Sequence, residues 1–222
     1  MQIKPALHAW NVTPSEALAL QRQLASQVVD DQPLDMASIR TVAGVDVSVK
    51  NEQSRAAIVV LSFPELEVLE AVTALQPTPF PYVTGLLSFR EAPVILEAFE
   101  KLATVPDVCL FDGMGRIHPR KIGIASHVGL WLPDIPTIGV GKTHLIGSYA
   151  PVGAEKGSIS PLSYHGEQLG VVLRTRTNVK PVYISCGHGC DLTSAVALVQ
   201  RCVTRYRLPE PIRAAHRFAG DF

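Results

Sequence analysis

Residues 41–49 read TVAGVDVSV, and this stretch decides the fold because its apolar side chains recur at every second position. In an extended strand Val45, Val47 and Val49 fall on one face. Asp46 falls on the opposite face. The stretch therefore predicts a β-strand whose buried valines hold a carboxylate in a fixed position.

The segments on either side of this strand predict a mixed α/β architecture. Two more strands, near 57–63 and 67–74, follow after short polar connections and complete an antiparallel meander. A capping box at Thr13-Pro14-Ser15-Glu16 starts a helix that we expect to run to about Val29. The other expected elements are a helix at 92–102 with Pro93 in its first turn, a strand at 108–111, a helix at 121–132, strands at 137–141, 169–174 and 181–185, and a helix at 191–206.

Three strands followed by helix, strand, helix and strand is the element order of a ribonuclease H-like domain. We therefore expect residues 1–222 to form a single domain with helices packed on a mixed β-sheet. The hydrophobic fraction of 47% is ample for a closed core. No apolar run approaches the roughly 20 residues that would span a membrane. Without a secretory signal, the four cysteines indicate reduced thiols in the cytoplasm.

Charge is unevenly distributed, although the formal net charge of the chain is zero. Residues 171–222 contain eight lysines and arginines and three acids, a net charge of +5. This polarity is compatible with a phosphate-binding flank beside a carboxylate site. A solvated surface would give the same pattern, so charge alone does not decide between the two.

Three carboxylates are placed at the edges of predicted elements. Asp46 lies on the first strand, Glu91 lies at the start of the helix after the meander, and Asp112 ends the fourth strand. The first and fourth strands can be neighbours in a mixed sheet, which would bring Asp46 and Asp112 together. Clustered carboxylates repel each other unless a cation holds them, and oxygen ligands suit Mg²⁺ or Mn²⁺. Taken singly, each acid could equally be a helix cap or a solvated charge.

Six motifs, in their order along the chain, resemble the endonuclease V family over about residues 15–209. They are Val42-Ala43-Gly44-Val45-Asp46, Pro81-Tyr82-Val83-Thr84-Gly85, Leu87-Ser88-Phe89-Arg90-Glu91, Asp112-Gly113-Met114-Gly115-Arg116-Ile117-His118-Pro119-Arg120, Ala125-Ser126-His127 and Pro136-Thr137-Ile138-Gly139-Val140-Gly141-Lys142.

The resemblance implies a ribonuclease H-like fold and dependence on Mg²⁺, with Mn²⁺ as a substitute. It implies cleavage of the second phosphodiester on the 3′ side of a deaminated purine such as inosine, leaving 3′-hydroxyl and 5′-phosphate ends. Asp46, Glu91 and Asp112 would be the metal carboxylates. His118 and Lys142 would complete the catalytic set, supporting the reacting phosphate or the attacking water.

The resemblance also implies a set of substrate-binding residues, namely Pro81, Tyr82, Leu87, Gly113, Gly115 and Ile124. Tyr82 would be a wedge that fills the gap left by a flipped base; the alternative is a core tyrosine. A flipped base could approach the backbone of Gly113 and Gly115 closely, although glycine after a strand is more often plain turn chemistry. Two departures from the family, Thr84 in place of proline and Met114 in place of histidine, put lesion preference more in question than catalysis.

Two other motifs suggest ligands that the residues do not support. Gly139-Val140-Gly141-Lys142-Thr143 lacks the first glycine of a nucleotide-binding P-loop, because position 136 is proline. Cys186, His188 and Cys190 could suggest zinc, yet only Cys202 offers an evident fourth ligand. Buried thiols are the favoured reading of the cysteines, with a role for His188 near the site left open.

The expected partner is inosine-containing DNA or RNA, and the motifs do not decide which is the main substrate. We expect a monomer that does not bind membranes. The alternatives are an endoribonuclease specific for inosine, a reader that binds inosine strands without cutting, and a phosphatase for small molecules. Intact carboxylates favour an enzyme over a reader, and the wedge and basic flank count against the phosphatase.

Overall fold

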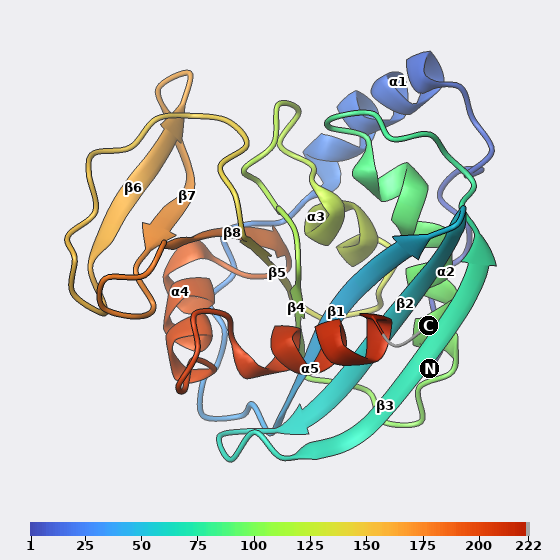
Figure 1. Ribbon diagram of the computed structural model, residues 1–222. Coiled ribbons are helices and arrows are strands. Elements are labelled where there is room, and N and C mark those ends of the chain that lie inside the picture. Colours follow the sequence, from blue (N-terminus) through green and yellow to red (C-terminus); the bar gives the residue numbers. More distant parts are fainter. Residues whose placement is uncertain (221–222) are drawn as a thin grey trace.

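The computed structural model describes residues 1–220 and shows three layers, a central β-sheet with helices on both faces (Figure 1). The sheet has eight strands in the order β3-β2-β1-β4-β5-β8-β7-β6. The strands are β1 (Thr41–Lys50), β2 (Gln53–Ser62), β3 (Val68–Pro77), β4 (Val108–Phe111), β5 (Thr137–Gly141), β6 (Ile159–Tyr164), β7 (Glu167–Leu173) and β8 (Val182–His188).

Strand directions make the sheet mixed, as the sequence predicts. The meander β1-β2-β3 is antiparallel. β4 runs parallel to both β1 and β5. The remaining strands β8, β7 and β6 are again antiparallel to their neighbours. The parallel pairing of β1 with β4 confirms that the first and fourth strands are neighbours.

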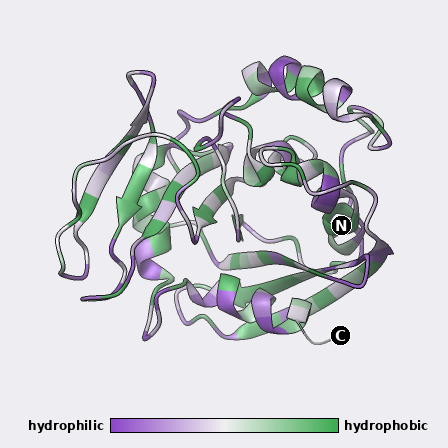
Figure 2. Cartoon of the chain, turned by 45° about the horizontal axis from the view of Figure 1, so that its top comes forward, coloured by the Kyte–Doolittle hydropathy of each residue, from purple (hydrophilic) through white to green (hydrophobic). Residues whose placement is uncertain are grey.

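Helices cover the sheet in two groups. They are α1 (Pro14–Leu24), the 3₁₀ turn η1 (Ala25–Gln27), α2 (Leu87–Glu100), α3 (Ile124–Gly129), α4 (Leu192–Arg201) and α5 (Glu210–Gly220). α2 and α3 share one hydrophobic cluster with the sheet, whereas α4 and α5 share a second cluster on the opposite face. Hydrophobic residues are concentrated in the strands, and the helices carry both kinds (Figure 2).

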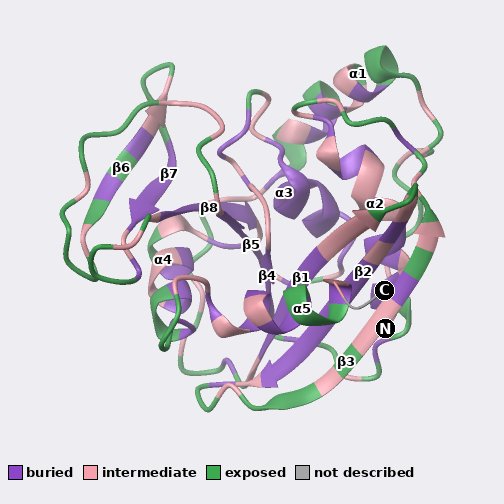
Figure 3. Ribbon diagram, in the orientation of Figure 1, coloured by how far each residue is buried: buried purple, intermediate pink, exposed green. Residues whose placement is uncertain are grey.

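Alternation along β1 explains why both faces are covered. Val45 belongs to the cluster under α2 and α3, and Val42 belongs to the cluster under α4 and α5. The central strands are buried, β3 at one edge is mostly exposed or half-buried, and β6 at the other edge alternates between exposed and buried residues over its first four positions (Figure 3). Because side chains alternate with a period of two, Asp46 lies on the same side of β1 as Val42. That side is the one covered by α5.

The structure corrects several predicted boundaries. α2 begins at Leu87, five residues before the expected start, and Pro93 lies inside it. The burial of Phe89 and Ala92 outweighs the cost of an internal proline. Glu91 is therefore inside the helix and not at its start, which corrects that prediction.

Other predicted helices were too long, and two elements were missed. α1 ends at Leu24 with a 3₁₀ turn after it, α3 spans only Ile124–Gly129, and α4 ends at Arg201. β6 and α5 were not predicted. The sequence of α5 does carry a helical signal, since its buried Ile212, Ala215 and Ala219 are spaced three and four residues apart. Among the described residues, no helix combines the length and apolar character needed to cross a membrane.

Candidate active site

Asp46 and Asp112 are brought together by the pairing of β1 with β4. Val45 and Phe111 are register partners in the parallel ladder, so the residues that follow them are also side by side. The backbone N–H of Asp112 donates to the carbonyl oxygen of Val45 at 2.9 Å, which continues this pairing past the end of β4. Both carboxylates are largely buried. Two of the three predicted metal carboxylates thus lie next to each other.

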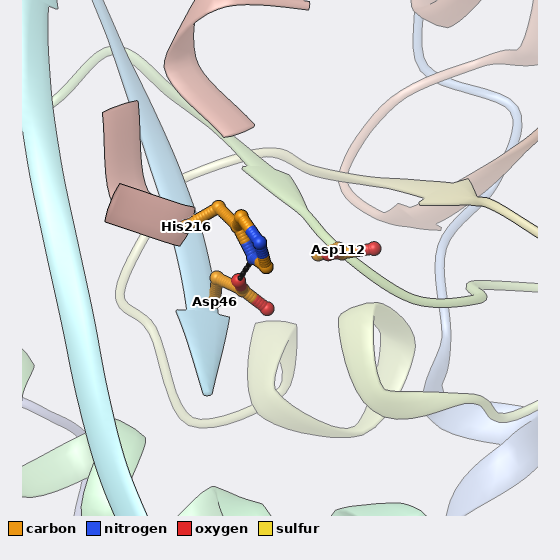
Figure 4. Close-up of side chains that lie close together, drawn as sticks. All are labelled: Asp46, Asp112 and His216. Carbon is orange, nitrogen blue, oxygen red and sulfur yellow. Dashed lines mark hydrogen bonds and ion pairs between the residues drawn. The ribbon is translucent and has the colours of Figure 1, made fainter. Parts of the chain in front are cut away.

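His216, on α5, is a site residue that the sequence analysis missed. Its Nδ1–H donates to Oδ2 of Asp46 at 2.6 Å, and the imidazole lies over Asp46 with Asp112 to one side (Figure 4). Ligand atoms of Asp46, Asp112 and His216 all lie within 4.8 Å of one another. The imidazole side chain is 63% exposed, so it faces solvent beside a buried carboxylate.

Close backbone packing holds α5 at the height that His216 requires. A Cβ atom added to Gly44 would lie 1.9 Å from the carbonyl oxygen of Pro211, so only glycine lets α5 approach β1 this closely. Pro211 is in the first turn of α5, and His216 follows in its second turn. Gly44 and Asp46 are two residues apart on the same face of β1. The glycine therefore places His216 above Asp46.

Burial and the nearby charge of Asp46 raise the pKa of two carboxyl groups, those of Asp112 and Glu91. Burial, together with the charge of Asp46, raises the pKa of Asp112 to about 6, against the opposing effect of Lys142. Burial, followed by the charge of Asp46, raises the pKa of Glu91 to about 8. Glu91 is not part of the cluster of ligand atoms that lie within 4.8 Å of one another, but the charges of both aspartates raise its pKa. Such a crowded acidic set is an arrangement that a cation stabilises.

The donor set fits a hard divalent metal ion. Asp46 and Asp112 offer carboxylate oxygens, and Glu91 stands close enough to be affected electrostatically by both. Oxygen donors suit Mg²⁺ and Mn²⁺, and imidazole is a common additional ligand for transition metals. The nearby ammonium of Lys142 makes an ion pair with Oδ2 of Asp112. Lys142 directly follows β5, and β5 is parallel to β4, which explains how it reaches this carboxylate.

A hollow of about 390 Å³ opens beside the carboxylates on the side of Asp112 and Lys142. Tyr82 stands at this hollow with 73% of its surface exposed, which excludes the alternative of a core tyrosine. Of the predicted substrate-binding residues, those that also line the hollow are Leu87, Gly113 and Ile124. Met114 lines it too and packs on Gly141, where an added Cβ would lie 2.3 Å from the Met114 methyl carbon.

The loop that carries Tyr82 is held by its glycine. Gly85 has a φ of 80°, a conformation that favours glycine. Its carbonyl oxygen accepts hydrogen bonds from three side chains, Nε2–H of Gln21 at 3.0 Å, Nε2–H of His118 at 2.9 Å and Nη2–H of Arg120 at 2.8 Å. The loop is thus anchored independently of the residue at Thr84.

His118 is buried, and both of its ring nitrogens are in use. While Nε2–H donates to Gly85, Nδ1 accepts the backbone N–H of Arg120 at 3.2 Å. Burial lowers the pKa of His118 to about 4, in keeping with a neutral ring. In this arrangement His118 anchors the loop of Tyr82. Its predicted action on the reacting phosphate or attacking water stays a prediction.

Gly113 and Gly115 already use their amides within the protein. The N–H of Gly113 donates to the carbonyl of Phe111 at 2.9 Å, and the N–H of Gly115 donates to Oγ of Ser185 at 3.0 Å. A Cβ on Gly115 would lie 1.9 Å from the carbonyl oxygen of Cys186, so this glycine is required by packing against β8. The contact of either glycine with a flipped base stays a prediction.

The two misleading motifs form no ligand site in the described part of the chain. β5 runs into Lys142 without a following helix, so the P-loop arrangement of strand, loop and helix is not formed. The cysteines are unpaired and buried, and none joins a cluster of potential metal ligands within residues 1–220. His188 accepts the backbone N–H of Val29 at its Nδ1, which gives it a structural contact away from the carboxylates.

Known proteins are similar to this chain in sequence and in fold. The family profile of endonuclease V matches residues 22–217. Endonuclease V of Nostoc punctiforme is 51% identical over 215 residues, which make up 96% of each chain. The structure of endonuclease V from Streptomyces avermitilis has a TM-score of 0.90 at 40% identity, covering 98% of this chain and 95% of that one. A Ciona intestinalis endonuclease V, solved with a 23mer DNA containing an inosine followed by a ribo-adenosine, has a TM-score of 0.81 at 27% identity, covering 94% and 97%. The chain therefore belongs to the endonuclease V family.

Proposed function

We propose that the protein hydrolyses the second phosphodiester bond on the 3′ side of a deaminated purine, leaving 3′-hydroxyl and 5′-phosphate ends. As an endonuclease V, it is a DNA repair endonuclease for deaminated purines, and nucleases of this family depend on a metal ion. The observation that carries the proposal is the cluster of Asp46, Asp112 and His216 beside a hollow lined by Tyr82. The inosine-containing DNA bound by the Ciona relative supports deoxyinosine as the lesion.

Asp46, Asp112 and Glu91 are the residues that would hold the metal ion, which we propose is Mg²⁺, with Mn²⁺ as a substitute. When bound, such an ion activates a water molecule and stabilises the leaving oxygen. His216 donates Nδ1–H to Asp46, and this fixes the orientation of its ring. In the neutral ring Nε2 is then an acceptor, and in residues 1–220 it has no hydrogen-bond partner. It can orient an attacking water by accepting one of its protons in a hydrogen bond.

Lys142 supplies a fixed positive charge at the edge of the hollow at which Tyr82 stands, and we call this hollow the lesion hollow. Its ammonium contacts Asp112 without a substrate, and a phosphate placed beside the carboxylates would come within its reach. A cation held in advance is most effective where negative charge develops in the transition state. The same position allows the ammonium to balance the carboxylate charge when no substrate is bound.

The hollow and the loop of Tyr82 provide lesion recognition. The exposed ring of Tyr82 can fill the gap that a flipped base leaves in the base stack. The hollow has a volume of about 390 Å³, which is within the usual range for ligand pockets. Leu87, Gly113 and Ile124 form the wall against which a flipped base would rest. His118 and Gly85 keep the loop in place.

A nicking assay on matched inosine DNA and inosine RNA, with and without Mg²⁺, tests this proposal. Metal-dependent cleavage of inosine DNA at the second 3′ phosphodiester, with no cleavage of an unmodified duplex, is the expected result. Preferential cleavage of the RNA would indicate an endoribonuclease. Binding without cleavage would indicate a reader, and hydrolysis of small phosphomonoesters alone would indicate a phosphatase. The variant Asp112→Asn serves as the inactive control.

The proposal also includes a monomeric protein of the cytoplasm. All four cysteines are buried and unpaired, which suits a reducing compartment. Sedimentation of the purified protein tests the oligomeric state.

A further inference from the structure

A second hollow, of about 410 Å³, is lined by His216, the partner of Asp46, and we call it the basic groove. The residues of the basic groove that matter here are Arg176, Tyr206, Arg207, Arg213, His216 and Arg217. Four of these six side chains are guanidinium groups, although the chain as a whole has no net charge. These four arginines are half of the eight lysines and arginines in residues 171–222, the segment with a net charge of +5.

Two arginines of the basic groove have side chains that are unpaired within residues 1–220. Arg176 and Arg217 are exposed, and across residues 1–220 neither guanidinium group makes an ion pair or a hydrogen bond. They come from distant parts of the chain, the loop after β7 and the helix α5, yet they line one hollow. Guanidinium groups that converge on a concave surface without acidic partners are suited to an anionic ligand.

The other two arginines are held in fixed positions. The guanidinium of Arg213 lies 3.5 Å from the ring centre of Tyr206 and pairs with Glu210 at 2.6 Å. Nη2 of Arg207 donates to the carbonyl oxygen of Lys142 at 2.6 Å. These contacts build one side of the groove rigidly. The hydrogen bond of Arg207 also connects the groove to Lys142, whose ammonium contacts Asp112.

The positions of the two hollows relative to the carboxylates indicate which part of a bound strand would lie in the basic groove. Asp112 and Lys142 line the lesion hollow, whereas His216, which contacts Asp46, lines the basic groove. The paired carboxylates thus connect the two hollows, Asp112 directly with the first and Asp46 through His216 with the second. A strand with its lesion base in the first hollow and a phosphodiester at the carboxylates would continue into the groove.

We propose that the basic groove binds backbone phosphates of the substrate strand on the 3′ side of the cleaved bond. The inference rests on the proposed function, because cleavage 3′ to the lesion is what assigns this polarity. Phosphate contacts by Arg176 and Arg217 carry no sequence information, so they position any strand whose lesion occupies the other hollow. The same groove would hold the product strand that begins with the new 5′-phosphate.

Binding measurements with two strand lengths test the groove. Inosine duplexes are prepared with the 3′ flank either ending one nucleotide after the cleaved bond or extending about six nucleotides further. Affinity is measured in EDTA, which prevents cleavage, for wild type and for the double variant Arg176→Gln/Arg217→Gln. The matched control is Arg40→Gln/Arg201→Gln, which removes two exposed arginines from a separate hollow near the start of β1.

We expect the groove variant to weaken binding of the long duplex about ten-fold or more and to lose roughly 1–2 units of salt slope, as for two lost phosphate contacts. Its affinity for the truncated duplex should match wild type, and the control should behave as wild type on both. Equal losses on both lengths, or an unchanged salt slope, would overturn the 3′ assignment. The 3′ assignment would also be overturned if the affinity loss of the double variant disappeared on a duplex with a shortened 5′ flank instead. Mg²⁺-dependent cleavage by wild type tests the proposed function separately, since that cleavage would survive failure of the groove.

Discussion

Nδ1 of His216 lies 2.6 Å from Oδ2 of Asp46, although 170 positions separate the two residues along the chain. The contact joins the last helix to the first strand and places an exposed imidazole beside a buried carboxylate. It leaves the second ring nitrogen, Nε2, directed away from Asp46.

Replacing His216 with alanine should slow the cleavage step by roughly 10²-fold or more, the effect typical of losing a positioned proton acceptor. Thermal stability should change little, because the side chain is 63% exposed. Single-turnover cleavage and thermal melting of the same protein check both parts. Cleavage at the wild-type rate would show that His216 takes no part in the reaction.

Asp46→Ala and Asp112→Ala should each abolish cleavage and leave the fold intact. The charge of Asp46 raises the cost of ionising Asp112, and either change ends this repulsion, so the metal-free protein should be no less stable than wild type. Cleavage of inosine strands in Mg²⁺ and unfolding in EDTA are the two measurements. Near wild-type cutting by either variant would contradict the metal assignment.

Tyr82→Ala should weaken binding to lesion-containing duplex by about 1–3 kcal/mol, as expected for the loss of a base–aromatic stack. The melting temperature should stay the same because Tyr82 is 73% exposed, whereas truncating a buried aromatic costs about 3–5 kcal/mol. Titration with inosine and unmodified duplexes measures the first effect. A weakened affinity that is equal on both duplexes would argue against a wedge.

Lys142→Met should reduce the rate of cleavage by roughly 10²-fold or more, comparable to losing one preorganised donor, with a modest loss of lesion binding. The ammonium contacts Asp112 at the edge of the hollow, and the segment after β5 does not form a P-loop. ATP binding should therefore be absent in wild type and variant alike. Measurable ATP affinity in a titration of the wild type would bring the nucleotide-binding interpretation back.

Stability should fall in mild acid because His127 is buried in its neutral form. His8 donates Nδ1–H to the carbonyl of Ala9, so its Nε2 accepts from Nε2–H of His127 at 2.8 Å. Nδ1 of His127 must then accept from the hydroxyl of Ser88, also at 2.8 Å. Burial, and after it the charges of His8 and His118, lowers the pKa of His127 to about 3.

The unfolded chain therefore takes up the proton first. The contribution of His127 to the unfolding free energy is fully present above about pH 6.5 and is lost as pH falls towards 3, at about 1.4 kcal/mol per pH unit at most. His127→Gln should show a shallower decline of the unfolding free energy over this range. Denaturant titrations at several pH values measure it, and parallel curves for the two proteins would contradict the assignment.

Local patterns in the sequence account for half of the site. Alternation predicts the strand that carries Asp46, and a short apolar run ending in Asp-Gly predicts the strand before Asp112. Their pairing follows from the order of elements in a mixed sheet. The motifs that resemble the family identify Tyr82, whose exposure the structure confirms.

The rest of the site depends on contacts between distant segments. His216 was missed because the buried face of α5 consists mainly of alanine, a weak hydrophobic signal. Nothing near His216 in the sequence indicates that Gly44 leaves room for this helix. Glu91 was placed at a helix start because Pro93 normally marks a first turn, and the burial of Phe89 overrides that preference. β6 contains Pro161 and two serines, Ser160 and Ser163, in only six residues, which hides its strand character.

The contact between Gly44 and Pro211 has a consequence for the synthesis of the protein. The ribosome makes Asp46 and Asp112 long before it reaches α5, and His216 can take its place only when that helix settles on Gly44. A nascent chain stalled before residue 210 thus holds the carboxylates without the imidazole. Stalled chains of this kind should not nick inosine strands, so a translating cell would not be exposed to a half-made nuclease.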